Sequence, residues 1–297
     1  MICFHHNDLD GRCAAAIVGY ACGRPAPGTV NRFVEMDYAK RVPTELIDLN
    51  ERVYIVDFHF KPNVMADVLA RTTDVVWIDH HATAAAYDYG RVIMGVRDFA
   101  PKTDKSGALL AWEYFFPTIT VPESVRLVCD FDTWTLKLVP KSLEFMEGMR
   151  LRDQSPESPI WPLLFADYLG GAEGQNAGIL IDEIAKVGAA SIAYRDQYCK
   201  DIRDNYGFEA EIVGHPGLSC YALNLYRFGS FAYGDAMKKY DVCAGFIFDG
   251  SKWTVSFYSL NSDVSVVAKG FGGGGHKGAS GCVTDDLGKV LRKKEAK

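Results

Sequence analysis

Met1-Ile-Cys-Phe-His-His-Asn-Asp-Leu-Asp-Gly11 opens the chain, and this stretch decides the fold. Its first part, Met1–His5, is a short apolar run typical of a buried β-strand, and the run ends abruptly in histidines and aspartates. Val53–Phe58 and Val75–Ile78 have the same character and also end in aspartate and histidine. Three such runs indicate buried strands whose polar residues gather where each strand ends.

Helix-like stretches separate these strands. Cys13–Cys22 is one, and Lys61–Arg71 is another, with a proline at its second position, where a missing N–H costs nothing. Strands that alternate with helices predict right-handed crossovers and a mainly parallel sheet, hence an α/β fold. Ligands gather at the carboxyl ends of the strands in such sheets. The polar clusters fall there, at residues 5–11, 57–59 and 79–81.

The second half of the chain changes character. Ser106–Phe116 and Pro122–Asp130 are predicted helices, and a longer helix is expected from Ala177 to about Asp204, ending at Gly207. Beyond it, alternating runs predict strands, and residues 270–281 are rich in glycine. We therefore predict a first α/β domain at 1–176, a connecting helix at 177–206, and a smaller α/β domain at 207–297.

Composition narrows the class of protein. The 297 residues are 48% hydrophobic and 24% charged, which is typical of a globular chain. The net charge of −6 argues against a broad basic face for long duplex nucleic acid. No apolar stretch approaches the roughly 20 residues of a membrane span, and the polar start does not resemble a secretory signal, so no membrane partner and a cytoplasmic location are expected.

The eight cysteines form no Cys-x-x-Cys pair. This spacing argues against both a disulfide framework and a structural zinc site. We expect the cysteines to be small buried residues.

His6, Asp8 and Asp10 form the first candidate site. On an extended segment, alternate side chains point the same way, so these three could converge on one cation. Asp8 could instead simply cap the following helix, which would explain one carboxylate but not all three residues.

Further candidates follow the later strands. Asp57 and Asp79 each end an apolar strand, where a turn would also accommodate aspartate. Asp79 is followed by His80 and His81, and a carboxylate beside two imidazoles can fix their tautomers. Asp130-Phe131-Asp132 adds carboxylates after a helix. Mixed oxygen and nitrogen ligands of this kind suit two divalent cations sharing a carboxylate.

The sequence Phe271-Gly-Gly-Gly-Gly-His276-Lys277 is the strongest short signal in the second half. Consecutive glycines allow backbone N–H groups to approach an anion closely, and His276 and Lys277 add donors. A flexible linker is the alternative, but the segment lies between two apolar runs.

Taken in order, these motifs resemble those of the DHH/DHHA1 phosphoesterase superfamily, over nearly the whole chain. That superfamily includes RecJ-type nucleases, nanoRNases, cyclic-dinucleotide hydrolases and exopolyphosphatases. The resemblance implies an N-terminal DHH domain and a C-terminal DHHA1 domain joined by the long helix. It also implies two Mn²⁺ ions, with Mg²⁺ or Co²⁺ as alternatives.

The resemblance further implies roles for individual residues. Asp57 would bridge the two metals, and His81, with Asp79 beside it, would act near the scissile phosphate. The metal ligands would be His6, Asp8, Asp10, Asp57, His80 and Asp130, and substrate would be gripped by Gly273, Gly274, Gly275, His276 and Lys277. Asp132 is the alternative to Asp130, which is favoured because it lies nearer the preceding helix. Tyr258 stands where many relatives carry arginine, which removes a phosphate contact.

We therefore expect metal-assisted hydrolysis of a phosphodiester in a short oligonucleotide or dinucleotide. Inorganic polyphosphate or another phosphate anhydride is the alternative substrate class, and a non-catalytic nucleotide-binding module is the alternative function. A homodimer is left open.

Overall fold

The computed structural model describes residues 1–23, 30–38, 40–100, 103–169, 171–226 and 228–295. The chain forms two compact units, Met1–Ser191 and Ile192–Lys297. Both are built from helices packed on a β-sheet, as predicted from the sequence.

The sheet of the first unit has four strands in the order β2-β1-β3-β4, and every pair of neighbours is parallel. The strands are β1 (Ile2–His6), β2 (Arg32–Met36), β3 (Val53–Val56) and β4 (Val75–Ile78). Consecutive strands β1 and β2 lie on one side, and β3 and β4 extend the sheet on the other side of β1. The strand order therefore reverses beside β1, and such a switch point is where open α/β sheets bind ligands.

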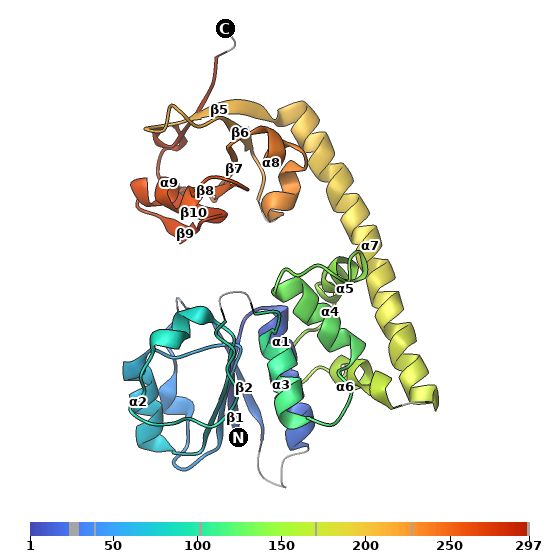
Figure 1. The fold of residues 1–297 in the computed structure, drawn as a ribbon. Coiled ribbons are helices and arrows are strands. Elements are labelled where there is room, and N and C mark those ends of the chain that lie inside the picture. Colours follow the sequence, from blue (N-terminus) through green and yellow to red (C-terminus); the bar gives the residue numbers. More distant parts are fainter. Residues whose placement is uncertain (24–29, 39, 101–102, 170, 227, 296–297) are drawn as a thin grey trace. The chain divides into compact units, whose positions relative to one another are not determined.

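Helices cover both faces of this sheet (Figure 1). Cys3, Val56 and Ile78 belong to the core on the side of α1 and α3, whereas Phe4 and Ile55 belong to the core on the side of α2. Strands buried on both faces explain why these segments are apolar without alternation. The helices of this unit are α1 (Leu9–Cys22), α2 (Pro62–Arg71), α3 (Gly107–Phe115), α4 (Glu123–Asp132), α5 (Lys141–Met149) and α6 (Ile160–Phe165), with 3-10 turns at Thr44–Leu46, Ala82–Ala86 and Ala166–Tyr168.

Helix α7 (Gly171–Tyr206) is 36 residues long, and the division between the two units falls inside it, after Ser191. It ends as predicted, because Gly207 follows and its N–H bonds to the carbonyl of Arg203 at 3.2 Å. It begins before the predicted start at Ala177. The sequence treats residues 177–206 as a separate connecting segment, whereas in the structure each unit includes part of this helix.

The second unit contains a seven-stranded mixed sheet in the order β11-β5-β6-β7-β8-β10-β9. Only β6 and β7 pair in parallel. Its core includes Val255 and Phe257 of the sheet and Val264 of α9. The elements are β5 (Phe208–Ile212), β6 (Cys220–Leu223), α8 (Ala236–Lys239), β7 (Val242–Phe248), β8 (Trp253–Tyr258), α9 (Val264–Gly270), β9 (Gly274–His276), β10 (Ala279–Thr284) and β11 (Leu291–Lys293), with 3-10 turns at Gly229–Tyr233 and Leu287–Lys289.

The cysteines are free thiols, and seven of the eight are buried as predicted. Cys22, at the end of α1, is the exception: it is exposed, and its Sγ lies 3.5 Å from the Tyr54 hydroxyl.

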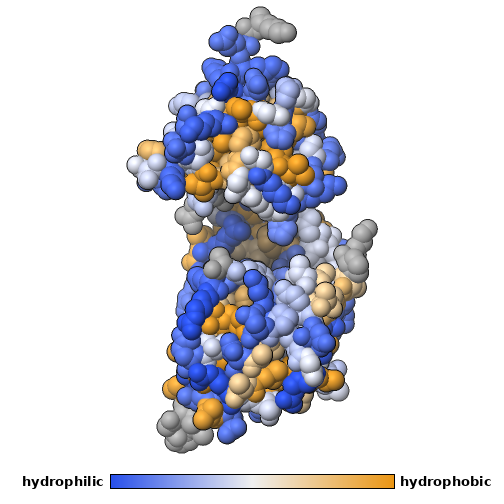
Figure 2. Space-filling model, turned by 90° about the vertical axis from the view of Figure 1, so that its left-hand side faces the viewer, coloured by the Kyte–Doolittle hydropathy of each residue, from blue (hydrophilic) through white to orange (hydrophobic). Residues whose placement is uncertain are grey.

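Hydrophilic residues dominate the visible surface of each unit in Figure 2, interrupted by hydrophobic areas. Within the described residues, no helix is both long and apolar enough to cross a bilayer.

Candidate functional site

The turn from β1 into α1 brings His6, Asp8 and Asp10 close together. His6 is the last residue of β1, and Asp8 is the N-cap of α1, where its carboxylate accepts the Gly11 N–H at 2.9 Å. Asp8 therefore does cap the helix, and it also contacts His6, with 2.6 Å between Oδ2 and Nδ1. Asp10 lies inside the first turn of α1. The segment does not stay extended as the sequence analysis assumed, because α1 begins after Asp8, and Asp10 groups with His80 and Asp132 rather than with His6 and Asp8.

Asp10 also anchors α3 beside this turn. Its two carboxylate oxygens accept the backbone N–H groups of Gly107 at 2.7 Å and Ala108 at 3.1 Å. Gly107 packs directly on Asp57, because a Cβ at position 107 would lie 2.5 Å from the Asp57 Cβ. Only glycine fits there, so the start of α3 forms a wall of the site.

Asp57 follows β3 and has a left-handed backbone conformation, with φ of 51°. Such a conformation is uncommon for a residue with a side chain and is found often at functional sites. Asp57 is 1% exposed, and neither of its carboxylate oxygens has a hydrogen-bond partner within the described part of the chain. A buried carboxylate without donors is costly unless cations lie beside it.

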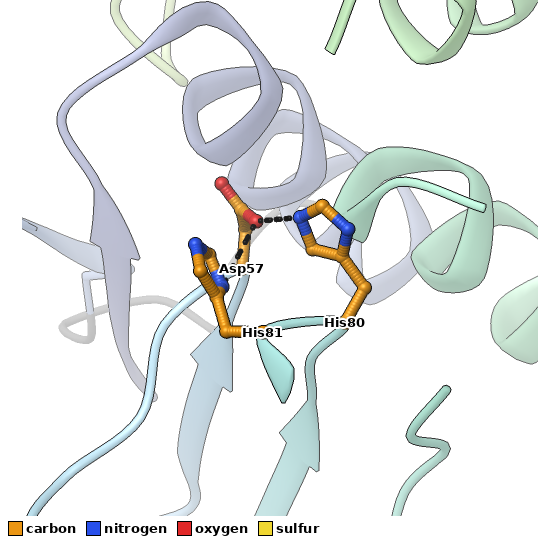
Figure 3. A group of neighbouring side chains, drawn as sticks. All are labelled: Asp57, His80 and His81. Carbon is orange, nitrogen blue, oxygen red and sulfur yellow. Dashed lines mark ion pairs between the residues drawn. The ribbon is translucent and has the colours of Figure 1, made fainter. Parts of the chain in front are cut away.

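His80 and His81 follow β4 and approach Asp57 (Figure 3). His80 Nε2 lies 3.0 Å from Asp57 Oδ1, and His81 Nδ1 lies 3.8 Å from the same oxygen. His81 Nδ1 is closer to Asp79, at 2.7 Å from Oδ1, and the His81 backbone N–H donates to that oxygen at 3.2 Å. Asp79 therefore fixes the orientation of the His81 ring.

His59 and Tyr38 also belong to this site, and the sequence analysis gave neither a role. His59 Nδ1 lies 3.3 Å from Asp79 Oδ2 and 2.9 Å from the Tyr38 hydroxyl. His59 is 5% exposed and Asp79 is fully buried. The position of His59, two residues after Asp57, was a signal in the sequence. Tyr38 could not be found in this way, because it follows β2, a strand that the sequence analysis missed.

The structure places Asp130 and Asp132 in different surroundings. Asp130 accepts hydrogen bonds from the Thr135 hydroxyl at 2.8 Å and from the backbone N–H groups of Lys137 at 2.7 Å and Leu138 at 3.1 Å. It therefore holds the loop after α4. Asp132 lies in the cluster instead, with Oδ2 buried, unpartnered within the described residues, and 3.5 Å from His80 Nε2.

The crowded carboxylates change one another's pKa. Burial, together with Asp10, Asp8 and Asp132, raises the pKa of Asp57 well above its usual range. Burial and the charges of Asp10 and Asp8 likewise raise the pKa of Asp132 to about 9. Burial alone would raise the pKa of Asp79 too, but hydrogen bonding to His59 and His81 lowers it to about 2. Neighbouring carboxylates thus dominate the surroundings of Asp57 and Asp132, whereas hydrogen bonds from two histidines dominate those of Asp79.

The histidines and aspartates of this site form several groups whose donor atoms lie close enough together to bind a cation. His6, Asp8 and Asp57 form one such group, and Asp10, His80 and Asp132 form another, each with its donor atoms within 4.8 Å of one another. Asp57 lies between them because it also groups with His80 and His81, and a fourth group comprises His59, Asp79 and His81. The bare, buried oxygens of Asp57 fit a role between two cations.

The glycine segment of the second unit is ordered as a strand. Residues Gly274–His276 form β9, which pairs antiparallel with β10. Gly275 has a φ of 137°, and a Cβ there would collide with Ser280, so glycine is required. His276 and Lys277 are exposed. Part of the reason for the glycines is therefore the close packing of β9 on β10, and the binding of substrate by 273–277 remains a prediction.

Comparisons with known proteins bear on the fold. No family model matches the chain. A solved structure described as the DHH domain of a member of the S1p family of ribosomal proteins aligns with a TM-score of 0.50 at 14% identity, over 97% of this chain and 83% of that one. The chain has the DHH fold. The predicted resemblance is thus confirmed at the level of the fold.

The chain is also similar to two further proteins. The pGpG-specific phosphodiesterase PggH from Vibrio cholerae aligns with a TM-score of 0.49 at 13% identity, over 96% of this chain and 93% of that one. An uncharacterized protein of Acanthamoeba polyphaga mimivirus, R106, is 27% identical over 245 residues, or 78% of this chain and 53% of the relative. The chain therefore spans about half the length of the curated relative it matches.

Proposed function

We propose that this protein is a metal-dependent phosphoesterase that hydrolyses a phosphodiester bond in a short oligonucleotide or dinucleotide. The observation that carries the proposal is Asp57, which is buried, has a left-handed backbone, and presents two oxygens without hydrogen bonds between two groups of metal-type ligands. The DHH fold and the order of the motifs support the same reaction class.

The residues present fit two divalent cations, and Mn²⁺ is the proposed metal. His6, Asp8 and Asp57 would hold one ion, and Asp10, Asp57, His80 and Asp132 would hold the other. Bound there, the cations would lower the pKa of a water molecule and offset charge on the phosphoryl oxygens. Asp132 replaces Asp130 in this assignment, because Asp130 already accepts three hydrogen bonds from its own loop.

His81 would act on the substrate itself. Its Nδ1 is held by Asp79, so the opposite ring nitrogen, Nε2, is left for an oxygen of the phosphate or of the leaving group. Burial lowers the pKa of His81, but hydrogen bonding to Asp79 and its charge raise it overall. A raised pKa keeps more of the imidazole protonated, which suits hydrogen-bond donation to a developing negative charge.

The test begins with protein freed of metal by a chelator. Metal binding would be measured by elemental analysis and by thermal unfolding during Mn²⁺ addition. Turnover would be measured with four substrates: a dinucleotide, a cyclic dinucleotide, adenosine bisphosphate and polyphosphate. We expect two Mn²⁺ per chain, and we expect Mn²⁺ to restore hydrolysis of the dinucleotide. Ca²⁺ should restore this hydrolysis poorly, since calcium prefers longer and more flexible coordination. Full hydrolysis in excess chelator would contradict the proposal, and preference for polyphosphate would replace its substrate class.

A further inference from the structure

A cavity of about 340 Å³ opens beside the aspartate cluster, wholly within the first unit. The loop after β2 supplies Tyr38, Lys40 and Arg41 to its wall, and the segment from β3 to α2 supplies Phe58, His59 and Lys61. Its size falls at the lower end of the range for sites that hold small organic molecules. No step of the proposed hydrolysis uses this cavity.

The cavity and the cluster share a wall. Tyr38 lines the cavity, and its ring centroid lies 5.7 Å from that of His6 and 5.9 Å from that of His81. His81 is the residue proposed to meet the scissile phosphate. A substrate group attached to that phosphate can therefore reach the cavity directly past Tyr38.

Tyr38 presents a fixed aromatic surface. Phe58 stacks on it with 4.5 Å between ring centroids and 22° between ring planes, and its hydroxyl bonds to His59 at 2.9 Å. Even so, 51% of Tyr38 is exposed. An aromatic ring that is held in place by its neighbours and remains half exposed suits the stacking of a planar base.

Basic side chains also line the cavity. Lys40 pairs with Asp37 at 3.3 Å and Arg41 with Glu45 at 2.9 Å, but Lys61 has no carboxylate within 4.0 Å among the residues the structure describes. Lys61 is also the N-cap of α2, whose first turn has no acidic residue and no side-chain cap. Its ammonium group and the first N–H groups of α2 together favour a phosphate. Asp37 and Asp67 also line the cavity and oppose this charge in part.

We propose that this cavity binds the nucleotide residue next to the scissile phosphate, with its base on Tyr38 and a phosphate at Lys61. This inference rests on the proposed function and sharpens it, because it gives the first unit its own nucleotide subsite. Inorganic polyphosphate has no planar ring, so an exposed aromatic wall would add nothing to its binding. The cavity therefore favours nucleotides over polyphosphate.

Binding of AMP to chelator-treated protein tests the proposal without any need for catalysis. Equilibrium dialysis would compare the wild type with Tyr38→Leu and Lys61→Ala, and with the matched controls Tyr114→Leu and Lys186→Ala, which change exposed residues elsewhere in the first unit. We expect each cavity variant to weaken AMP binding by at least about fivefold, the lower end for loss of a stacked base or a charged hydrogen bond. The controls should bind AMP as the wild type does. Tyr38→Phe, which keeps the ring, should also retain binding and serves if Tyr38→Leu fails to fold.

Kinetics supply the second measurement. The ratio of kcat/KM for the dinucleotide pApA to that for bis(p-nitrophenyl) phosphate should fall in both cavity variants, because the small diester lacks a nucleotide to place there. Equal AMP binding by all variants, or no AMP binding by the wild type, would overturn the proposal. If AMP binding follows the expected pattern while no substrate is hydrolysed, the subsite stands and the proposed hydrolysis fails.

Discussion

The aspartate cluster of the first unit and the glycine segment of the second differ in whether their polar atoms are satisfied. Asp57 and Asp132 have buried carboxylate oxygens without a hydrogen bond in the described structure. In the glycine segment, β9 pairs with β10, and the Gly273 N–H bonds to the Ala268 carbonyl at 2.9 Å. In the first region a bound cation would contact the carboxylate oxygens that have no hydrogen bond. The second is complete as a backbone structure, so its contribution should be binding rather than metal chemistry.

Asp57→Asn should have the largest effect and tests the first side of this comparison. It should lower kcat/KM roughly a thousandfold, which corresponds to about 4 kcal/mol of lost transition-state stabilisation, because it weakens both proposed metal groups. In chelated protein the same change should raise the Tm, since it removes a carboxyl group whose burial among other carboxylates is unfavourable. Steady-state kinetics with Mn²⁺ would measure the first effect and scanning calorimetry of the chelated protein the second, and Asp48→Asn, at an exposed carboxylate, is the control. A chelated variant less stable than the wild type would show that the carboxylate is satisfied by the protein.

Asp132→Asn and Asp130→Asn form a pair that separates metal binding from loop structure. The first should remove one Mn²⁺ per chain and lower kcat/KM about a hundredfold, by analogy with other losses around metal sites. The second should lower the Tm, because three hydrogen bonds to Asp130 are weakened, yet keep both ions. Elemental analysis decides between them, and the reverse pattern would restore Asp130 as the ligand.

This pair also shows how far the sequence could go. The parallel sheet, the long helix and the positions of His6, Asp57 and His80 follow from apolar runs and from where those runs end. Asp130 and Asp132 lie in the same last turn of α4, and only the folding of the loop at 133–138 onto Asp130 distinguishes them. Strand β2, with its exposed Glu35, has no continuous apolar run and was missed, so Tyr38 was missed with it. The contacts of Asp130 with its loop and of Tyr38 with His59 arise only when separate segments of the chain pack together, so they could not be predicted from local sequence patterns.

His81→Gln should cost about a hundredfold in kcat, the lower range for loss of a general acid, and should keep both metal ions. Its effect should shrink for a substrate whose leaving group needs no proton, such as a p-nitrophenyl ester. Rates for the two substrates, measured with metal content on the same samples, would test this. Loss of Mn²⁺ from His81→Gln would instead make His81 a ligand.

His276→Ala should have the smallest effect and tests the second side of the comparison. Removing one hydrogen bond to a phosphate should cost about 1–3 kcal/mol, seen mainly as a higher KM for the dinucleotide. Metal content and Tm should not change, because His276 is exposed and its backbone pairing in β9 remains. Lys252→Ala removes an exposed basic side chain elsewhere in the second unit and is the control for a general loss of basic groups. A loss of metal in His276→Ala would contradict the division of roles between the two regions.

Because the cysteines differ in exposure, their reaction with a thiol reagent can measure local unfolding of the chain. A thiol reagent should modify Cys22 at once in the native protein, whereas the other seven react only when their surroundings open. Cys3, Cys13 and Cys129 belong to the first unit, and the remaining four buried cysteines belong to the second. Mass spectrometry of the labelled peptides would therefore give separate opening free energies for the two units from the wild-type sequence alone. Mn²⁺ should slow labelling in the first unit more than in the second.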